Sequence, residues 1–221
     1  MECRKYTYLF NLSGTDCFLA APDSAPLSPR FSYESTDVFR TVTPRSLAFA
    51  GATAQHLSNW YTVNQFCGRC GHPMMHDQKE RMLKCTSCGN RVYPQISPAV
   101  IAGIMDGNKL LLTRYAGRAY KKYALVAGFI EIGESAEEAV KREVMEETGV
   151  KIKNIRYYKS QPWGFSQSLL FGFYADLDGA ENLTVDQNEL SEAVWIDKGD
   201  IDVTPNNLSL TNEMICRFKG I

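Results

Sequence analysis

The sequence lacks any long hydrophobic run and any excess of charge of one sign. None of its 221 residues fall in an apolar stretch of about 18, the length that a helix needs to span a membrane. Its 24 Lys and Arg balance 25 Asp and Glu, so no overall field favours nucleic acid or a membrane surface. The N-terminal segment MECRKYTYLF has no apolar signal core followed by a small-residue cleavage site. We therefore expect a cytoplasmic protein.

The chain also lacks internal repeats and low-complexity tracts, and 44% of its residues are hydrophobic. This composition allows roughly one to three compact units. Changes of pattern along the chain predict a small N-terminal α/β domain at 1–64, a Cys- and Gly-rich segment at 65–92 and a mixed domain at 93–221. In the first, YTYLFNL and CFLAAP are strand candidates, APDSAPLSPRFS is typical of a loop, and a helix is expected after Pro44.

The mixed domain joins strand-like runs to helical patterns. AVIAGIM and KLLLTRY flank the turn Asp106-Gly107-Asn108, which predicts two neighbouring strands. Further strands are expected in ALVAGFI, VKIKNIRYY, SLLFGFYADL and EAVWI, and a last short helix in NEMICRF. The predicted fold class is α+β.

Four of the seven cysteines form two Cys-x-x-Cys pairs, Cys67/Cys70 and Cys85/Cys88. In a reducing compartment such pairs favour metal binding over disulfides. Four thiolates at this spacing are typical of a closed, structural Zn²⁺ site. The alternative is four unrelated buried or redox-active cysteines. The remaining cysteines are interpreted as small apolar residues without a functional role: Cys3, Cys17 and Cys216.

A zinc ribbon can contact nucleic acid, contact a second subunit or support a neighbouring domain. Five basic residues between 65 and 92 make the segment mildly basic, but Asp77 and Glu80 dilute that charge. A solvated face is therefore the simpler interpretation. His72 and His76 lie near the cysteines and are interpreted as surface residues, because four thiolates already complete the site.

Residues 128–150, GFIEIGESAEEAVKREVMEETGV, contain seven glutamates. Ser135 and Glu138 form a capping-box pattern that starts a helix near Ala136, and Gly149 is placed to end it. The helix carries an apolar stripe that should face a core: Ala136, Ala139, Val140 and Val144.

Glu143, Glu146 and Glu147 should lie within about one turn of this helix, where like charges repel. One interpretation is a solvated acidic face with basic partners, which is usual for helical glutamates. The other is a cation site, because carboxylates beside a glycine-containing loop suit Mg²⁺ or Mn²⁺ and a phosphate substrate. The preceding loop favours the second interpretation, since it carries Glu134, a carboxylate that Arg142 could clamp.

This segment resembles the Nudix box at every fixed position: Gly128, five residues, Glu134, seven residues, then Arg-Glu-Val-Met-Glu-Glu-Thr-Gly-Val. The resemblance implies a mixed sheet between helices. It also implies that water attacks a diphosphate linked to a nucleoside, with two or three Mg²⁺ or Mn²⁺ ions per site. The implied metal and catalytic groups are Glu143, Glu146, Glu147 and the carbonyl of Ala127. The implied structural residues of the box are Gly128, Gly133, Glu134, Arg142 and Gly149.

A second segment, SQPWGFSQS at 160–168, follows the box. Trp163 and Phe165 are two residues apart, so in an extended segment they would project to the same side. They would then offer flat surfaces for a base or a nicotinamide ring, and Ser160, Gln161 and Ser168 would offer hydrogen bonds. The alternative is a proline-containing turn whose aromatic side chains belong to a core.

In context the segment resembles the SQPWPFPxS signature of NADH pyrophosphatases, Nudix enzymes with a four-cysteine ribbon followed by a Tyr-Pro pair, matched here by Tyr93-Pro94. The resemblance spans about residues 46–221. It implies cleavage of NAD(H) to NMN(H) and AMP, and removal of NAD caps from RNA 5′ ends, which breaks the same bond. It also implies one Zn²⁺ per chain and a homodimer in which Tyr93 reaches the partner's site. Glu189 would be a further metal ligand. The implied substrate contacts are Glu80, Tyr93, Phe129, Ser160, Gln161, Pro162, Trp163, Gly164, Phe165, Ser166, Gln167 and Ser168.

The chain departs from that signature where Gly164 and Ser166 replace both prolines. We expect this change to loosen the loop and to alter selectivity. Ser209-Leu-Thr211 also stands where the family usually has a small-residue pattern, and the N-terminal domain looks short. One alternative function is a broader ADP-ribose or dinucleotide diphosphatase. Another is a non-catalytic Nudix sensor or RNA-binding module, which loss of box residues would favour, and none is lost.

Overall fold

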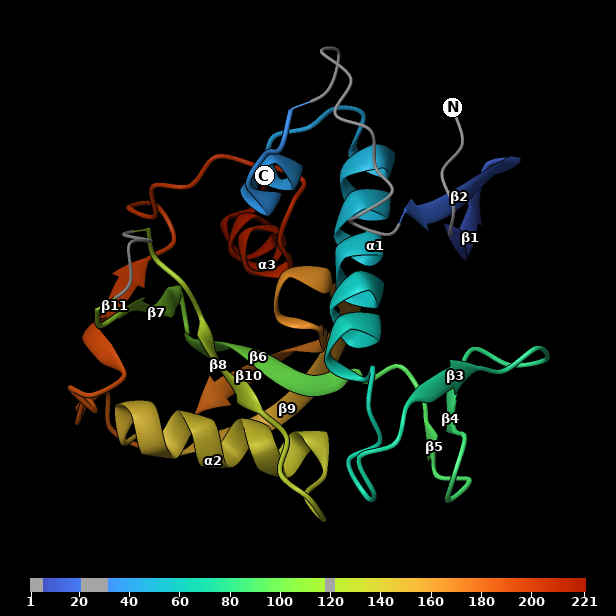
Figure 1. The fold of residues 1–221 in the computed structure, drawn as a ribbon. Helices are drawn as coiled ribbons and strands as arrows, with labels where there is room; N and C mark the ends of the chain where they lie inside the picture. Colours follow the sequence, from blue (N-terminus) through green and yellow to red (C-terminus); the bar gives the residue numbers. More distant parts are fainter. Residues whose placement is uncertain (1–5, 21–31, 118–121) are drawn as a thin grey trace. The chain divides into compact units, whose positions relative to one another are not determined.

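The computed structural model describes residues 6–20, 32–117 and 122–221. The loop expected from Ala21 lies outside the described residues except for its last position, and Cys3 lies outside them too. Packing divides the chain into two units, one of Met1–Ile96 with Gly164–Gln167 and one of Ser97–Trp163 with Ser168–Ile221 (Figure 1). None of the helices in the described ranges is long and apolar enough to cross a membrane.

In the residues that the structure describes, the first unit contains a hairpin, two short 3₁₀ helices, one long helix and the cysteine segment. The predicted strand YTYLFNL and the predicted helix are confirmed, and so is CFLA of the second predicted strand, whose last two residues lie outside the described ranges. The elements are β1 (Tyr6–Leu12), β2 (Thr15–Ala20), η2 (Thr36–Arg40), α1 (Arg45–Val63), β3 (Met74–His76), β4 (Leu83–Cys85) and β5 (Arg91–Val92). β1 and β2 pair antiparallel, and β3, β4 and β5 form a separate antiparallel sheet in the order β3-β4-β5.

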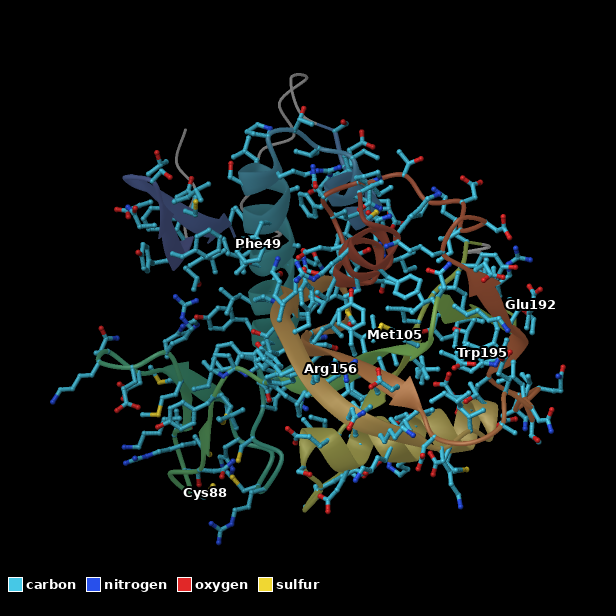
Figure 2. All side chains as sticks on the ribbon, turned by 180° about the vertical axis from the view of Figure 1, so that it is seen from behind. Phe49, Cys88, Met105, Arg156, Glu192 and Trp195 are labelled. Carbon is cyan, nitrogen blue, oxygen red and sulfur yellow. The ribbon has the colours of Figure 1, made fainter. Side chains whose placement is uncertain are left out.

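Helix α1 buries mainly small side chains along its first half. Ala48, Ala50 and Ala52 are buried, whereas Leu47 and Phe49 remain exposed (Figure 2). Gly51 continues this small surface, because a Cβ there would lie 2.2 Å from Cε1 of Phe39. The small residues therefore let η2 pack directly on the helix.

The second unit is built on one mixed sheet. Its strands are β6 (Ser97–Asp106), β7 (Lys109–Tyr115), β8 (Val126–Phe129), β9 (Ile152–Trp163), β10 (Ser168–Leu177) and β11 (Leu190–Asp197). The order is β11-β7-β6-β10-β9, and β8 pairs with the first half of β6. β10 runs parallel to β6, and the other pairs are antiparallel, so the expected mixed sheet is confirmed.

Two helices cover opposite faces of this sheet, α2 (Ala136–Thr148) and α3 (Leu210–Lys219) (Figure 1). Alternate residues of β6 enter different cores, because side chains of a strand alternate between its two faces. Val100 and Ile104 pack with the apolar stripe of α2, and Ile101 packs with the buried face of α3. Trp195 and Met105 lie on the same two faces respectively (Figure 2).

The start of α2 follows the predicted capping box. Ser135 Oγ accepts a hydrogen bond from the Glu138 N–H at 3.3 Å, and Glu138 Oε2 accepts one from the Ser135 N–H at 2.8 Å. Gly149 ends the helix with a φ of 74°, in the left-handed region that glycine adopts readily.

Ser135→Ala should lower the free energy of unfolding by about 1 kcal/mol, because it removes the side chain that caps α2. Urea denaturation monitored by circular dichroism measures this change. Ser135→Thr is the matched control, since a threonine hydroxyl can accept the same bond. Equal stability of the alanine variant and the wild type would show that the cap contributes nothing.

Candidate active site and zinc ribbon

Arg142 organises the loop between β8 and α2. Its Nε and Nη2 donate to the two oxygens of Glu134, both at 2.8 Å, and Nη2 also donates to the Phe129 carbonyl at 2.9 Å. This bidentate ion pair holds the pKa of Glu134 below its usual value. The predicted clamp between Arg142 and a loop carboxylate is present in the structure.

The same guanidinium also forms hydrogen bonds with two of the helix glutamates. Nη1 of Arg142 donates to Oε1 of Glu143 at 2.7 Å and to Oε2 of Glu146 at 3.1 Å. Burial nevertheless raises the pKa of Glu143, against the effect of Arg142 and with a smaller contribution from the charges of Glu146 and Glu189. A second cation would therefore stabilise the ionised form of Glu143 further.

Gly128 leaves the space that the Glu143 carboxylate occupies. A Cβ at position 128 would lie 2.0 Å from Cδ and 2.0 Å from Oε1 of Glu143. Any side chain here would push the carboxylate away from β8. The glycine therefore allows the Glu143 carboxylate to lie directly against β8.

Gly128→Ala should weaken binding of Mn²⁺ to the metal-free protein by about tenfold or more, because the added methyl group displaces one carboxylate ligand. Titration followed by electron paramagnetic resonance measures the dissociation constant. Gly199→Ala is the control, since a Cβ there meets no atom within 4 Å. Unchanged Mn²⁺ binding by the Gly128 variant would mean that Glu143 is not a ligand.

The three clustered glutamates have very different environments. Glu147 is 1% exposed and Glu143 is half-buried, whereas the side chain of Glu146 is 59% exposed. Buried carboxylates in proteins are normally paired or bound to a metal, because desolvating a charge is costly. The acidic group is thus not simply a solvated helix face.

A further loop docks on the end of α2 and carries Glu189. The N–H of Asp186 donates to the Glu147 carbonyl at 3.1 Å, and the N–H of Thr184 donates to the Thr148 carbonyl at 2.9 Å. The charge of Glu189 makes a small contribution to the raised pKa of Glu143. Ala127 directly precedes Gly128 on β8 and pairs with Ile101 of β6.

Carboxylate and carbonyl oxygens are hard donors of the kind that Mg²⁺ and Mn²⁺ prefer. The carboxylate oxygens of the glutamates do not all lie as close to one another as the sulfur atoms of the four cysteines do. In the described ranges, the four cysteines are the only group of three or more His, Cys, Asp or Glu whose ligand atoms all lie within 4.8 Å of one another. Arg142 holds two of the glutamates, so metal binding must compete with those ion pairs.

The segment 160–168 forms a hairpin rather than one extended strand. β9 ends at Trp163, which pairs with Ser168 of β10, and Gly164–Ser166 form the 3₁₀ turn η3. Gln167 completes the turn with a φ of 57°. The prediction that Trp163 and Phe165 project from one extended segment is therefore wrong for Phe165, because the chain reverses at Gly164.

Gln161 binds backbone at both ends of its amide. Its Nε2 donates to the Leu208 carbonyl at 3.1 Å, and its Oε1 accepts from the Leu210 N–H at 2.6 Å. The side chain thus holds the start of α3, where Ser209 is the N-cap and accepts a hydrogen bond from the N–H of Asn212. The sequence did not reveal this link, because no local pattern connects β9 to a helix so much later in the chain.

Other expected substrate contacts are exposed or at strand ends. Phe129, at the end of β8, is 53% exposed. Tyr93 is 51% exposed, and its hydroxyl donates to Oε2 of Glu80 at 2.9 Å. That bond raises the pKa of Tyr93. A hydrogen bond therefore joins Tyr93 and Glu80, two of the expected substrate contacts. Ser168, another of them, is buried.

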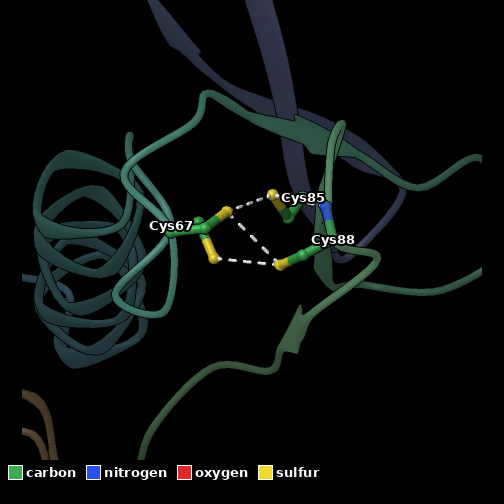
Figure 3. A group of neighbouring side chains, drawn as sticks. Cys67, Cys85 and Cys88 are labelled. Atoms are coloured by element: carbon green, nitrogen blue, oxygen red, sulfur yellow. Dashed lines mark hydrogen bonds between the residues drawn. The ribbon is translucent and has the colours of Figure 1, made fainter.

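The four cysteines converge as a zinc site requires (Figure 3). The Sγ atoms of Cys70 and Cys85 are 3.4 Å apart, as are those of Cys70 and Cys88, and those of Cys67 and Cys88 are 3.7 Å apart. Zn–S bonds of about 2.3 Å at tetrahedral angles separate the sulfurs by about 3.8 Å. The cysteines thus form a four-cysteine zinc ribbon site.

Backbone N–H groups also favour thiolates at this site. The N–H of Arg69 donates to Sγ of Cys67, and those of Ser87 and Cys88 donate to Sγ of Cys85. These bonds lower the pKa of Cys67, and they lower that of Cys85 to about 6. His72 and His76 are not in the metal group of the described residues, and His76 stacks on the ring of Tyr61.

Comparison with protein families agrees with this geometry. The model of the NUDIX domain matches residues 95–217, which is more than half of the 221-residue chain. The chain belongs to the Nudix family. The model of the NADH pyrophosphatase zinc ribbon domain matches residues 64–93.

Individual relatives point the same way. "NAD-capped RNA hydrolase NudC" of Salmonella typhi is 44% identical over 149 residues, covering 67% of this chain and 58% of that protein. The same-named protein of Citrobacter koseri is 43% identical with the same coverage. The chain thus matches less than two thirds of the length of these relatives. A Nudix hydrolase from Nitrosomonas europaea shares the fold, with a TM-score of 0.54 and 23% identity over 62% of this chain and 80% of that one.

Proposed function

We propose that this Nudix protein hydrolyses the diphosphate of NAD(H) to NMN(H) and AMP. The observation that carries the proposal is the carboxylate group organised by Arg142 beside the Gly128 cradle. The match to the NADH pyrophosphatase zinc ribbon supports the choice of substrate. The names of the NudC relatives support it too, since an NAD cap contains the same diphosphate.

Glu143, Glu146, Glu147 and Glu189, with the carbonyl of Ala127, would hold Mg²⁺ or Mn²⁺ in this proposal. Two or three such ions would neutralise the diphosphate oxygens and lower the pKa of the attacking water. One of the glutamates accepts the proton of that water. Glu143 fits a ligand role because burial raises its pKa and an added cation would stabilise its ionised form.

The box residues around this group have positioning roles. Arg142 and Glu134 fix the loop between β8 and α2, and Gly128 admits the Glu143 carboxylate. Gly133, at a φ of 89°, and Gly149 allow the chain to turn before and after the helix. Phosphoryl transfer depends mainly on such positioning and on charge neutralisation.

Substrate contacts in the proposal come from Phe129, Tyr93 with Glu80, and the hairpin at 160–168. Exposed aromatic rings such as Phe129 and Tyr93 offer faces on which a nicotinamide or adenine ring can stack. Tyr93 would act in the site of the other subunit of a homodimer, as the family resemblance implies. Gln161 would act through the backbone at Leu208–Leu210 instead of touching the substrate.

The ribbon in this proposal holds one Zn²⁺ per chain and has a structural role. We divide the chain into an N-terminal domain at 1–64, the ribbon at 65–92 and the Nudix domain at 93–221. Four thiolates kept reduced for metal binding fit a cytoplasmic location.

A second candidate activity is removal of NAD caps from RNA 5′ ends. The names of the NudC relatives favour it, and it requires cleavage of the same bond. The broader diphosphatase activity on ADP-ribose or dinucleotides stays the main alternative, because Gly164 and Ser166 replace the signature prolines.

The test is a comparison of turnover on NADH, NAD⁺, ADP-ribose, a diadenosine polyphosphate and an NAD-capped RNA, each with Mg²⁺ or Mn²⁺. The proposal predicts the highest kcat/KM with NAD(H) or with the capped RNA. Faster cleavage of ADP-ribose or the diadenosine compound would favour the broader activity. No cleavage of any substrate would favour a binding role.

A further inference from the structure

The hairpin turn η3 packs with the N-terminal elements. Gly164–Gln167 group with the first unit by their contacts, although β9 and β10 on either side belong to the second. Within the first unit, this turn packs against α1, and Arg40 of η2 contacts its Phe165 ring. The turn carries both positions at which the chain departs from the signature prolines, Gly164 and Ser166.

Gly164 lies directly against the backbone of α1. A Cβ at this position would be 2.6 Å from the carbonyl oxygen of Ala52 and 2.9 Å from its carbonyl carbon. The obstacle is helical backbone, which cannot move aside as the end of a flexible side chain can. Proline also carries a Cβ, so the signature proline does not fit this position unless the turn and the helix separate.

One residue earlier on α1, Gly51 holds η2 in place. The ring of Phe39 occupies the space that a Cβ of Gly51 would fill, at 2.2 Å from Cε1. The next residue of η2 is Arg40. Two consecutive residues of α1 therefore contact different elements: Gly51 packs against η2, and Ala52 packs against the hairpin turn.

Arg40 lies over the aromatic ring of the turn. Its Cζ is 4.3 Å from the ring centroid of Phe165, which is cation–π distance. Its Nε donates to Oδ1 of Asp37 at 3.0 Å, and Nη1 of Arg45 donates to the Arg40 carbonyl at 2.9 Å. Arg40 is therefore held at its guanidinium by Asp37 and at its backbone carbonyl by Arg45.

We propose that η2 and α1 replace the two missing prolines by holding η3 from outside, with Arg40 as the positioning residue for Phe165. Proline restricts a loop through its own ring, whereas here the restriction comes from packing against Ala52 and Arg40. The N-terminal region is then part of what sets substrate selectivity. The assignment of Phe165 to the substrate rests on the proposed function, but the packing does not.

Hydrogen exchange tests the packing without any activity. In the full-length protein, Arg40→Ala and Gly164→Ala should each accelerate amide exchange several-fold in the peptide covering Gly164–Ser168. Arg40→Lys, which keeps a cation over the ring, should restore much of the protection. The control Gly199→Ala should leave this peptide unchanged, because a Cβ there meets no atom within 4 Å. Unchanged exchange in both test variants would overturn the proposal.

Steady-state kinetics then test the link to selectivity. Arg40→Ala should raise KM for NAD(H) several-fold with kcat nearly unchanged, because the carboxylate group is not altered. A fall in kcat with unchanged KM would contradict a positioning role. If the wild type cleaves none of the dinucleotides, the proposed function fails, whereas the exchange experiment still decides whether the N-terminal region holds the turn.

A variant that restores both signature prolines tests the proposal most strictly. Gly164→Pro with Ser166→Pro should accelerate exchange in α1 around Ala52 and raise KM, because the proline Cβ displaces the helix from the turn. A double variant with slower exchange throughout the turn and a lower KM would show that the turn does not rest on α1.

Discussion

Glu143→Gln and Glu147→Gln should each lower the turnover of NAD(H) by about 10³-fold or more, equivalent to about 4 kcal/mol of transition-state stabilisation. Glutamine keeps the shape of the side chain but removes the charge that holds a divalent cation. The diphosphate would then lack the charge neutralisation on which its hydrolysis depends. Steady-state kinetics at saturating Mn²⁺ measure the loss.

The same substitutions should leave the fold intact. Burial raises the pKa of Glu143 above its value in the unfolded chain, so ionised Glu143 destabilises the metal-free protein once the pH exceeds that raised pKa. Removing the charge of Glu143 at neutral pH therefore removes this destabilisation of the folded protein. Glu147 is 1% exposed, and a neutral glutamine is less costly than a charged carboxylate to bury at that position. Thermal unfolding of the metal-free variants should occur at or above the wild-type temperature.

Glu137→Gln is the matched control, because Glu137 lies in the exposed first turn of α2. It should retain wild-type turnover. A Glu143 or Glu147 variant that keeps near wild-type turnover would remove that residue from the mechanism. A variant that loses turnover together with its circular dichroism spectrum would have lost its fold instead.

Cys67→Ser should release zinc and unfold the ribbon, which is the second large effect expected. Zinc binding to small ribbon-like domains is worth roughly 10–16 kcal/mol, far more than three short strands can contribute alone. The sheet β3-β4-β5 has strands of only two or three residues, so little else holds it together. Zinc content by mass spectrometry and proteolysis between 65 and 92 measure the loss.

The proposed homodimer should weaken in the same variant, because the proposed contact residue Tyr93 directly follows the ribbon. Sedimentation at several concentrations measures this. Cys17→Ser is the control, since Cys17 lies on β2 outside the four-cysteine group. Retention of zinc, protease resistance and the dimer by Cys67→Ser would contradict the structural role of the site.

Local patterns were sufficient to predict much of this molecule. The capping box, the apolar stripe of α2 and the cysteine pairs each depend on residues close in sequence, and each appears in the structure as expected. The strands were recognisable because their apolar runs are bounded by turn residues.

The parts that the sequence did not predict depend on contacts between distant segments. Phe165 leaves the extended conformation because the hairpin closes through η3. The Gln161 side chain forms hydrogen bonds with the backbone at the start of α3. Arg40, from the N-terminal region, lies over the ring of Phe165. No local spacing encodes these partners. The loop that was expected to be loosened by losing two prolines is instead packed against Ala52.

The most direct test of the central claim is hydrolysis of NADH in ¹⁸O-labelled water with Mn²⁺, followed by chromatography and mass spectrometry. We predict NMNH and AMP as the products, with ¹⁸O in the phosphate of one of them and a rate lower by about 10³-fold or more in Glu147→Gln. Release of nicotinamide would contradict it, because a different bond would have been broken. Undiminished cleavage by the Glu147 variant would show that the buried carboxylate is not part of the catalytic group.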